Sequence, residues 1–223
     1  MCGRIVQKSG PMVYMETIRW NPAHILAADP TGPRYNVPPG TRPMVMHQLD
    51  RQPDIARLFW GYAPAWFARS PVSNARIDTL LDPAKSFWRS ALASGRVIVP
   101  ADGWFEWTRE GDAKVPWFIY PKDGQPLLMA AVSGWRPAAE PDKAHGMAIV
   151  TDDAAGGMID IHDRRPVVLT ADAAQEWADP STTVSTAKAI MTAGRPESAF
   201  SWHRVTVRMN SARYQLPDAV EPI

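Results

Sequence analysis

The sequence predicts an α+β fold, with a single domain over residues 1–223 and a curved, mainly antiparallel, barrel-like β core carrying a few peripheral helices. Short runs of β-branched and aromatic residues recur along the chain and are bounded by Pro, Gly or Asp. These runs follow one another without helical patterns between them, which disfavours βαβ units. The 22 prolines and 14 glycines indicate many turns and argue against a helical bundle.

The strand pattern is clearest in the middle third of the chain. We expect strands in these runs, given in chain order: CGRIV, MVMHQ, RLFWGY, RVIVPADGWFEW, PWFIY, PLLMAAVSGW, MAIVT, PVVLT and WHRVTV. The segments GDAK (111–114) and KDGQ (122–125) have the composition of tight turns, so we expect each to join two strands as a hairpin.

Helical patterns are fewer. The best covers 82–94, where Asp82 can cap the first turn, Pro83 suits its first position and Gly95 can end it. A second helix is expected from Thr170 to Ala178, and a third over about 181–191.

Composition narrows the class of protein. The chain is 45% hydrophobic and 21% charged, as soluble globular proteins are. Its longest apolar run, Leu127 to Val132, is too short to cross a bilayer, and the N-terminus lacks the apolar stretch of a secretory signal. A single cysteine excludes an internal disulfide. We therefore expect a cytoplasmic protein that does not bind membranes.

Metal and cofactor chemistry are not indicated. The five histidines have no metal-ligand spacing, and the GxSxG, Walker A and GxGxxG signatures are absent. We expect no metal and no cofactor.

Charge is uneven along the chain although the net charge is only +1. Residues 1–96 carry twelve Lys and Arg against six Asp and Glu, whereas the remaining residues are net acidic. An arginine-rich first half can form the positive face that a nucleic-acid backbone needs, but these charges can equally be spread over a solvated surface.

The only cysteine is residue 2. If Met1 is removed, Cys2 carries a thiol and an α-amine on adjacent carbons. An α-amine titrates near pH 7.7–8.0, so about a tenth of it is neutral at pH 7. The neutral amine can form an imine with an aldehyde, and the thiol can then close a thiazolidine ring on the same carbon. An internal cysteine or a lysine cannot do this.

Seven blocks occur in a characteristic order behind this start. They are CGR, RYNVPP (34–39), WGYAPAW (60–66), NARIDT (74–79), VPADGWFEW (99–107), SGW (133–135) and IHDRRPVVL (161–169). Together they resemble the SRAP (SOS-response-associated peptidase) family, in particular its single-domain bacterial members, over essentially the whole chain. The resemblance implies a covalent sensor of abasic sites in single-stranded DNA, which crosslinks to the open-chain aldehyde through the N-terminal cysteine. It also implies autoproteolytic exposure of that cysteine.

The resemblance also implies roles for individual residues. Cys2 matches the nucleophile, and Asn74 matches the asparagine that holds the N-terminal residue and the sugar. Glu106 matches the acid/base glutamate, and His162 matches the histidine that helps to open the sugar and move protons. Because alternate strand residues share a face, Glu106 is expected beside the Trp104 indole, a setting that can raise its pKa.

The expected DNA contacts come from the same matches. Arg4 and Arg76, with Arg164 as a weaker candidate, match arginines that contact phosphates. Trp66 and the Pro38–Pro39 pair match a wedge that stacks on the bases flanking the lesion, and Trp104 is expected to line the pocket. Stacking ignores sequence, which suits a lesion sensor. We expect a monomer that associates with the nucleoid when bound to DNA.

Three positions depart from the family pattern: Arg165, Tyr62–Ala63 and Pro38. Each concerns packing or the wedge and not a catalytic side chain.

Two alternatives stay open at the level of sequence. An N-terminal-nucleophile amidohydrolase would use the α-amine as a base and the Cys2 thiol to attack an amide. A noncovalent module for single-stranded DNA would make Cys2 incidental.

Overall fold

The computed structural model describes residues 2–21 and 32–223. Within them the expected α+β fold is confirmed, with strands in antiparallel-rich sheets and five α-helices. The strands are β1 (Ile5–Gln7), β2 (Arg34–Val37), β3 (Met44–His47), β4 (Asp54–Arg57), β5 (Asn74–Arg76), β6 (Arg96–Ala101), β7 (Gly103–Glu110), β8 (Ala113–Pro121), β9 (Leu127–Ser133), β10 (Met147–Asp153), β11 (Arg164–Pro166), β12 (Val168–Leu169) and β13 (Phe200–Arg204). The α-helices are α1 (Pro11–Thr17), α2 (Ile77–Leu81), α3 (Arg89–Ser94), α4 (Ala171–Ala178) and α5 (Val184–Thr192). Four 3₁₀ turns complete the described elements: η1 (Gly156–Asp160), η2 (Glu197–Ala199), η3 (Val207–Asn210) and η4 (Pro217–Val220).

The strands form two sheets. One has the order β13-β8-β7-β1-β2, and the other has the path β11-β10-β9-β6-β3-β4, with β12 paired to β9 and β5 paired to β10. All pairings between these strands are antiparallel except that of β5 with β10. The core is therefore curved and mainly antiparallel, as expected, and its sheets are open rather than closed into a barrel.

Side chains from both sheets meet in a central layer. In β9, Leu127, Met129 and Ala131 point into this layer, while Leu128, Ala130 and Val132 point to the opposite face of the sheet. Both faces of β9 are thus buried, which explains why its sequence reads as a continuous apolar run and not as an alternating one. We call this region the inter-sheet layer; Cys2, Trp104 and Ile149 belong to it.

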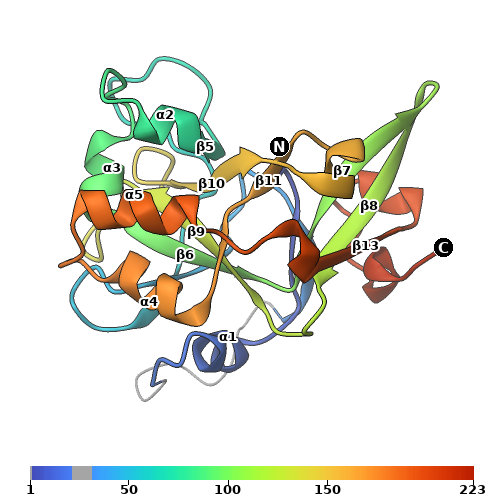
Figure 1. The fold of residues 1–223 in the computed structure, drawn as a ribbon, viewed down its shortest axis with the longest axis horizontal. Coiled ribbons are helices and arrows are strands. Elements are labelled where there is room, and N and C mark those ends of the chain that lie inside the picture. The colour runs from blue at the N-terminus through green and yellow to red at the C-terminus, as the bar shows by residue number, and fades with distance from the viewer. Residues whose placement is uncertain (1, 22–31) are drawn as a thin grey trace.

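Helices cover the outer face of the larger sheet. Figure 1 shows α3, α4 and α5 together on one flank of the molecule, with β7, β8 and β13 on the other. Between these helices and the larger sheet lies a second hydrophobic core, separate from the inter-sheet layer. It contains Leu92 of α3, Trp177 of α4 and Ile190 of α5, packed against sheet residues such as Ile98. Thr170 caps α4 by accepting the Ala173 N–H, and α4 covers the range that the sequence predicts.

Three local expectations are wrong. RLFWGY (57–62) is not a strand, because β4 ends at Arg57 and only isolated bridges at Trp60 and Tyr62 follow. Only the second part of the predicted helix 82–94 forms, because residues 82–88 are a loop that follows α2 and the regular helix begins only at Arg89. The GDAK turn does join β7 to β8, but KDGQ joins β8 to β9, and these strands lie in different sheets. A turn composition predicts a change of direction and does not say whether the next strand returns to the same sheet.

Candidate active site

The site lies at one end of the inter-sheet layer, where the chain enters β1. Cys2 is fully buried there. Ile5 pairs with Trp104, and the Phe105 N–H donates to the Arg4 carbonyl at 3.0 Å, so residues 4–5 run antiparallel to β7. If the same register continues beyond Arg4, the next residue towards the N-terminus, Gly3, lies opposite Glu106. Cys2 is the neighbour of Gly3.

Asn74 reaches the site from β5. It pairs in parallel with Ile149, whose side chain points into the inter-sheet layer, so the Asn74 amide points the same way. Its Nδ2 donates to the Cys2 carbonyl oxygen at 3.1 Å and to Ser73 Oγ at 3.2 Å. Its Oδ1 is buried and accepts no hydrogen bond within the described residues. A buried acceptor left without a donor costs free energy, so this oxygen is suited to a donor on a ligand.

The Cys2 thiol stays protonated near neutral pH. Burial raises its pKa well above the ordinary value, and the nearby Glu106 carboxylate raises it further. Reactive cysteines that attack as thiolates have lowered pKa values and electropositive surroundings. The Cys2 environment is the opposite, which disfavours a mechanism that begins with a thiolate.

Glu106 lies on the face of β7 that points into the inter-sheet layer. Trp104 shares this face, whereas Phe105 points to the outer side of the sheet, so the predicted alternation is confirmed. Glu106 is only 2% exposed, and burial raises the pKa of its carboxyl to about 8. At pH 7 most molecules therefore carry a neutral carboxylic acid here, which can give up a proton and later take one back.

His162 lies in the loop between η1 and β11, with its Nε2 4.0 Å from Glu106 Oε2. Its Nδ1 accepts the Arg164 backbone N–H at 3.0 Å and also lies 2.9 Å from Asp163 Oδ1. Nδ1 cannot accept a hydrogen bond from the Arg164 N–H and donate one to Asp163 at the same time. Burial lowers the pKa of the imidazole, which favours the neutral form with its proton on Nε2, the nitrogen nearer Glu106. The pair thus holds two groups that can exchange protons.

Trp104 forms part of the wall of this region. Its indole is fully buried and meets the Phe200 ring edge-on, with centroids 5.3 Å apart. The indole N–H has no acceptor within the described residues. Trp104 therefore adds an unused donor to a layer that already holds the unused Asn74 acceptor.

Arg76 and Arg164 come close together through shared acidic partners. Arg76 donates to Asp78 through Nε at 3.1 Å and Nη2 at 2.5 Å, and Arg164 Nη2 lies 3.9 Å from the same carboxylate. Arg164 Nε also pairs with Asp153 at 3.1 Å. Arg76 is exposed and lies two residues after Asn74, so its guanidinium can meet an anion beside the site.

Arg4 is held differently. Its Nη1 donates to Asn36 Oδ1 at 2.7 Å and to the Met209 carbonyl at 3.3 Å, and its guanidinium lies 5.8 Å from the Trp107 ring centre. These contacts place it on the outer side of the small sheet. Arg4 therefore has a structural role in addition to any contact with a phosphate.

The proposed wedge residues come from two loops. Trp66 is 70% exposed and contacts the rings of Phe67 and Phe87 edge-on. Pro38 and Pro39 are half-buried at the end of β2, where the Gly40 N–H donates to the Trp60 carbonyl at 2.8 Å. An exposed tryptophan of this kind is a ready surface for stacking.

Two of the departing positions pack as expected. Tyr62 stacks on Trp88, with ring centroids 5.5 Å apart. Arg165 is half-buried and donates to the Arg195 carbonyl at 2.7 Å. Neither side chain takes a place beside Cys2.

Sequence reasoning missed two groups at this site. Asp78 holds both candidate phosphate-binding arginines, and its position two residues after Arg76 was a readable signal. Thr151 is buried in β10 beside Arg76, on the same sheet face as Ile149, and its hydroxyl has no partner within the described residues. No local signal points to Thr151, because only the parallel pairing of β5 with β10 brings it there.

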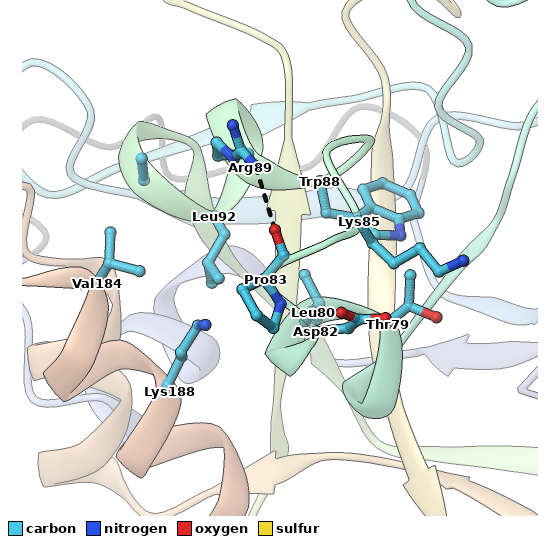
Figure 2. Close-up of a pocket in the computed structure, with 11 residues that line it drawn as sticks. Thr79, Leu80, Asp82, Pro83, Lys85, Trp88, Arg89, Leu92, Val184 and Lys188 are labelled. Carbon is cyan, nitrogen blue, oxygen red and sulfur yellow. Dashed lines mark hydrogen bonds between the residues drawn. The ribbon is translucent and has the colours of Figure 1, made fainter.

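A separate pocket of about 110 Å³ lies between α2, α3 and α5 (Figure 2), and no predicted site residue lines it. Within residues 2–21 and 32–223, no cluster of three or more His, Cys, Asp or Glu side chains is arranged to hold a metal ion. No helix in the same residues is long and apolar enough to span a membrane.

Comparison with known proteins identifies the class that this fold and site define. The sequence pattern of the SOS response associated peptidase (SRAP) family matches residues 1–212. The chain belongs to this family.

Individual relatives match most or all of the chain. The chain is 39% identical to the abasic site processing protein YedK of Escherichia coli, covering 100% of both chains. It is 30% identical to the abasic site processing protein YoqW of Bacillus subtilis, covering 82% of each. Among solved structures it resembles a phage-related protein of Bordetella bronchiseptica, with a TM-score of 0.82 and 49% identity, covering 97% of this chain and 100% of that one.

Proposed function

We propose that this protein processes abasic sites in DNA, and that it does so by forming a thiazolidine crosslink between Cys2 and the lesion in single-stranded DNA after Met1 is removed. The observation that carries the proposal is the grouping at the start of β1: Cys2 is held by Asn74 and lies beside a Glu106 whose pKa is raised to about 8. The names of the relatives support abasic DNA as the substrate.

The reaction is proposed to begin with the amine, because the Cys2 thiol is protonated. The sugar ring opens when a proton leaves its O1′ hydroxyl and another reaches the ring oxygen. The neutral α-amine then attacks the C1′ aldehyde, and protonation of the resulting hydroxyl releases water and leaves an imine. Finally the thiol sulfur adds to the imine carbon while its proton passes to the nitrogen. Across these steps, the C1′ carbon forms one bond to nitrogen and one bond to sulfur, and the aldehyde oxygen leaves as one molecule of water.

Glu106 and His162 are suited to these proton transfers. The neutral Glu106 carboxyl can protonate the leaving hydroxyl, and the resulting carboxylate can accept the next proton. His162, with its Nε2 4.0 Å from Glu106, is proposed to act on the sugar during ring opening. The unused acceptor of Asn74 and donor of Trp104 are suited to polar atoms of the sugar.

The DNA surface is proposed to combine charge with stacking. Arg76 and Arg164 would bind phosphates next to the lesion, with Arg4 as a further contact, while Trp66 and the Pro38–Pro39 pair would separate the flanking bases. We further propose that the protein acts as a monomer, associates with the nucleoid when bound to DNA, and exposes Cys2 by autoproteolysis.

Intact mass spectrometry tests the proposal. The protein is weighed before and after mixing with a single-stranded oligonucleotide that carries one abasic site. We expect loss of Met1, followed by an adduct equal to protein plus oligonucleotide minus one water, stable to denaturation without borohydride. Cys2→Ala keeps an α-amine and should give at most an imine that borohydride must trap.

Other results point to other functions. An equally stable adduct with Cys2→Ala would remove the thiazolidine from the mechanism. No adduct, with equal affinity for intact and abasic oligonucleotides, would favour a noncovalent binding module. An acyl adduct with a small amide would favour an amidohydrolase.

A further inference from the structure

We propose that Phe87 is a positioning residue for DNA binding, which fixes the Trp66 indole in the orientation that stacks on a base. This inference rests on the proposed function. Trp66 carries most of its surface in solvent, yet its ring meets Phe87 edge-on, with centroids 5.7 Å apart and planes at 78°. Phe67 contacts both rings, at 6.1 Å from Trp66 and 4.8 Å from Phe87.

Phe87 connects this exposed ring to the core. Its ring lies 4.5 Å from that of Trp88, at 89°, and 5.5 Å from that of Tyr62. Trp88 is buried in the core under the helices. A continuous series of aromatic contacts, which we call the aromatic ladder, therefore runs from Trp88 through Phe87 to Trp66.

The loop that carries Phe87 is tied down at its other end. It spans residues 82–88, within the stretch 82–94 that the sequence predicts as helix. Lys188 of α5 donates to the Leu81 carbonyl at 3.3 Å, and Arg89 of α3 donates to the Pro83 carbonyl at 3.3 Å. Figure 2 shows the second bond and the approach of Lys188 from α5 across the small pocket. The loop is thus bonded to α3 through Pro83 and begins at the end of α2, which α5 holds, so Phe87 offers Trp66 a fixed support.

A fixed support matters because of conformational entropy. An exposed side chain that is free to rotate loses that freedom when a base stacks on it, and this loss opposes binding. Edge-to-face aromatic contacts hold the indole in one orientation before DNA arrives. Removing the Phe87 ring should therefore weaken stacking while leaving the phosphate contacts unchanged.

A double-mutant cycle tests this inference. The probe is a single-stranded oligonucleotide with a central tetrahydrofuran residue, which mimics an abasic site but has no aldehyde, so only noncovalent binding is measured. Phe87→Leu keeps an apolar side chain and loses the ring. We expect it to weaken binding about two- to tenfold, with the salt dependence unchanged. Phe87→Tyr should bind as the wild type does.

The same substitution in a Trp66→Ala background separates positioning from general stability. If Phe87 acts through Trp66, Phe87→Leu causes no further loss of binding there, although it still lowers the melting temperature through its lost contacts with Tyr62 and Trp88. It should also have no effect on an oligonucleotide whose bases next to the lesion are replaced by spacers. Val184→Ala, on the far side of the pocket, is the matched control and should leave binding unchanged.

Two results would overturn the inference. One is wild-type binding by Phe87→Leu while Trp66→Ala is impaired, and the other is the same loss in both backgrounds. Wild-type binding by Trp66→Ala itself would remove the wedge from the proposed function, and the inference about Phe87 would fall with it. The crosslinking proposal is judged separately, by the mass of the adduct.

Discussion

At the scale of single residues, position along a strand decides the chemistry of Glu106. A glutamate two residues after Trp104 must share its face, and that face points into the inter-sheet layer. Water is excluded there, so the charged form is disfavoured and the pKa rises to about 8. A carboxyl one position earlier or later would point to the other side of β7, away from Cys2.

This shift predicts how Glu106 affects stability. Its folded pKa of about 8 lies above the ordinary value of 4.5, so between these pH values the folded state binds more protons than the unfolded state. The free energy of unfolding should therefore fall as pH rises through this window, by up to about 1.4 kcal/mol per pH unit. Glu106→Gln lacks this dependence. Urea denaturation at pH 5, 6.5 and 8 should show the variant gaining on the wild type as pH rises, and a constant difference would contradict the raised pKa.

The division of labour between Glu106 and His162 gives a second prediction. Loss of a positioned acid or base typically slows a reaction by about 10²–10⁴. Single-turnover crosslinking should slow accordingly in Glu106→Gln and His162→Ala, with affinity for unmodified DNA nearly intact. An oligonucleotide bearing a simple aldehyde has no ring to open. It should restore much of the His162→Ala rate and less of the Glu106→Gln rate, because dehydration to the imine still needs an acid. Equal rescue of both variants would overturn this division.

At the scale of elements, local patterns predicted what lies within one strand and missed what depends on pairing between distant ones. The alternation along β7 gave the correct face for Glu106, and Thr170 gave the start of α4. The parallel pairing of β5 with β10 left no such trace, although it turns Asn74 towards Cys2 and brings Thr151 beside Arg76. Family resemblance supplied the role of Asn74 that periodicity could not. The helix predicted over 82–94 forms only from Arg89 onwards. Tertiary contacts outweigh weak helix propensity over so short a segment, and the sequence pattern does not show them.

The junction of β5 and α2 predicts distinct salt effects. Each phosphate contact to single-stranded DNA contributes about 0.7 to the slope of log affinity against log salt. Arg76→Ala should weaken binding and reduce the slope by about that amount. Asp78→Asn removes the carboxylate that holds the Arg76 guanidinium and lies near Arg164, which keeps its pair with Asp153, so it should strengthen binding and steepen the slope. Trp66→Ala should weaken binding with little change in slope. Titrations on the tetrahydrofuran oligonucleotide at several salt concentrations measure the slope for all three variants. If every variant has the same slope as the wild type, the phosphate contacts lie elsewhere.

At the scale of the whole molecule, the geometry of the candidate site depends on how the two sheets pack against each other. Glu106 comes from the smaller sheet and Asn74 from the larger one, so the inter-sheet layer sets the distance between them. The larger sheet is in turn held by the helices on its outer face. One side chain joins these parts: Arg96, at the start of β6, is 2% exposed and donates to carbonyls at the ends of α3 and α4.

The last prediction concerns the contribution of Arg96 to stability. Its guanidinium donates to five carbonyl oxygens, those of Leu92, Ala93, Trp177, Asp179 and Thr182. Arg96→Met keeps an unbranched side chain that replaces the aliphatic part of arginine but leaves these acceptors without donors. Hydrogen bonds to a charged donor are each worth about 1.5–3 kcal/mol, so the variant should lose at least about 3 kcal/mol of unfolding free energy. Arg96→Lys restores the charge but offers fewer donors, and its loss should be intermediate. Urea denaturation measures both. Crosslinking well below the melting temperature should stay near the wild-type rate, because Arg96 acts on the helices and not on Cys2; a small loss of stability together with a large loss of rate would show that it does more.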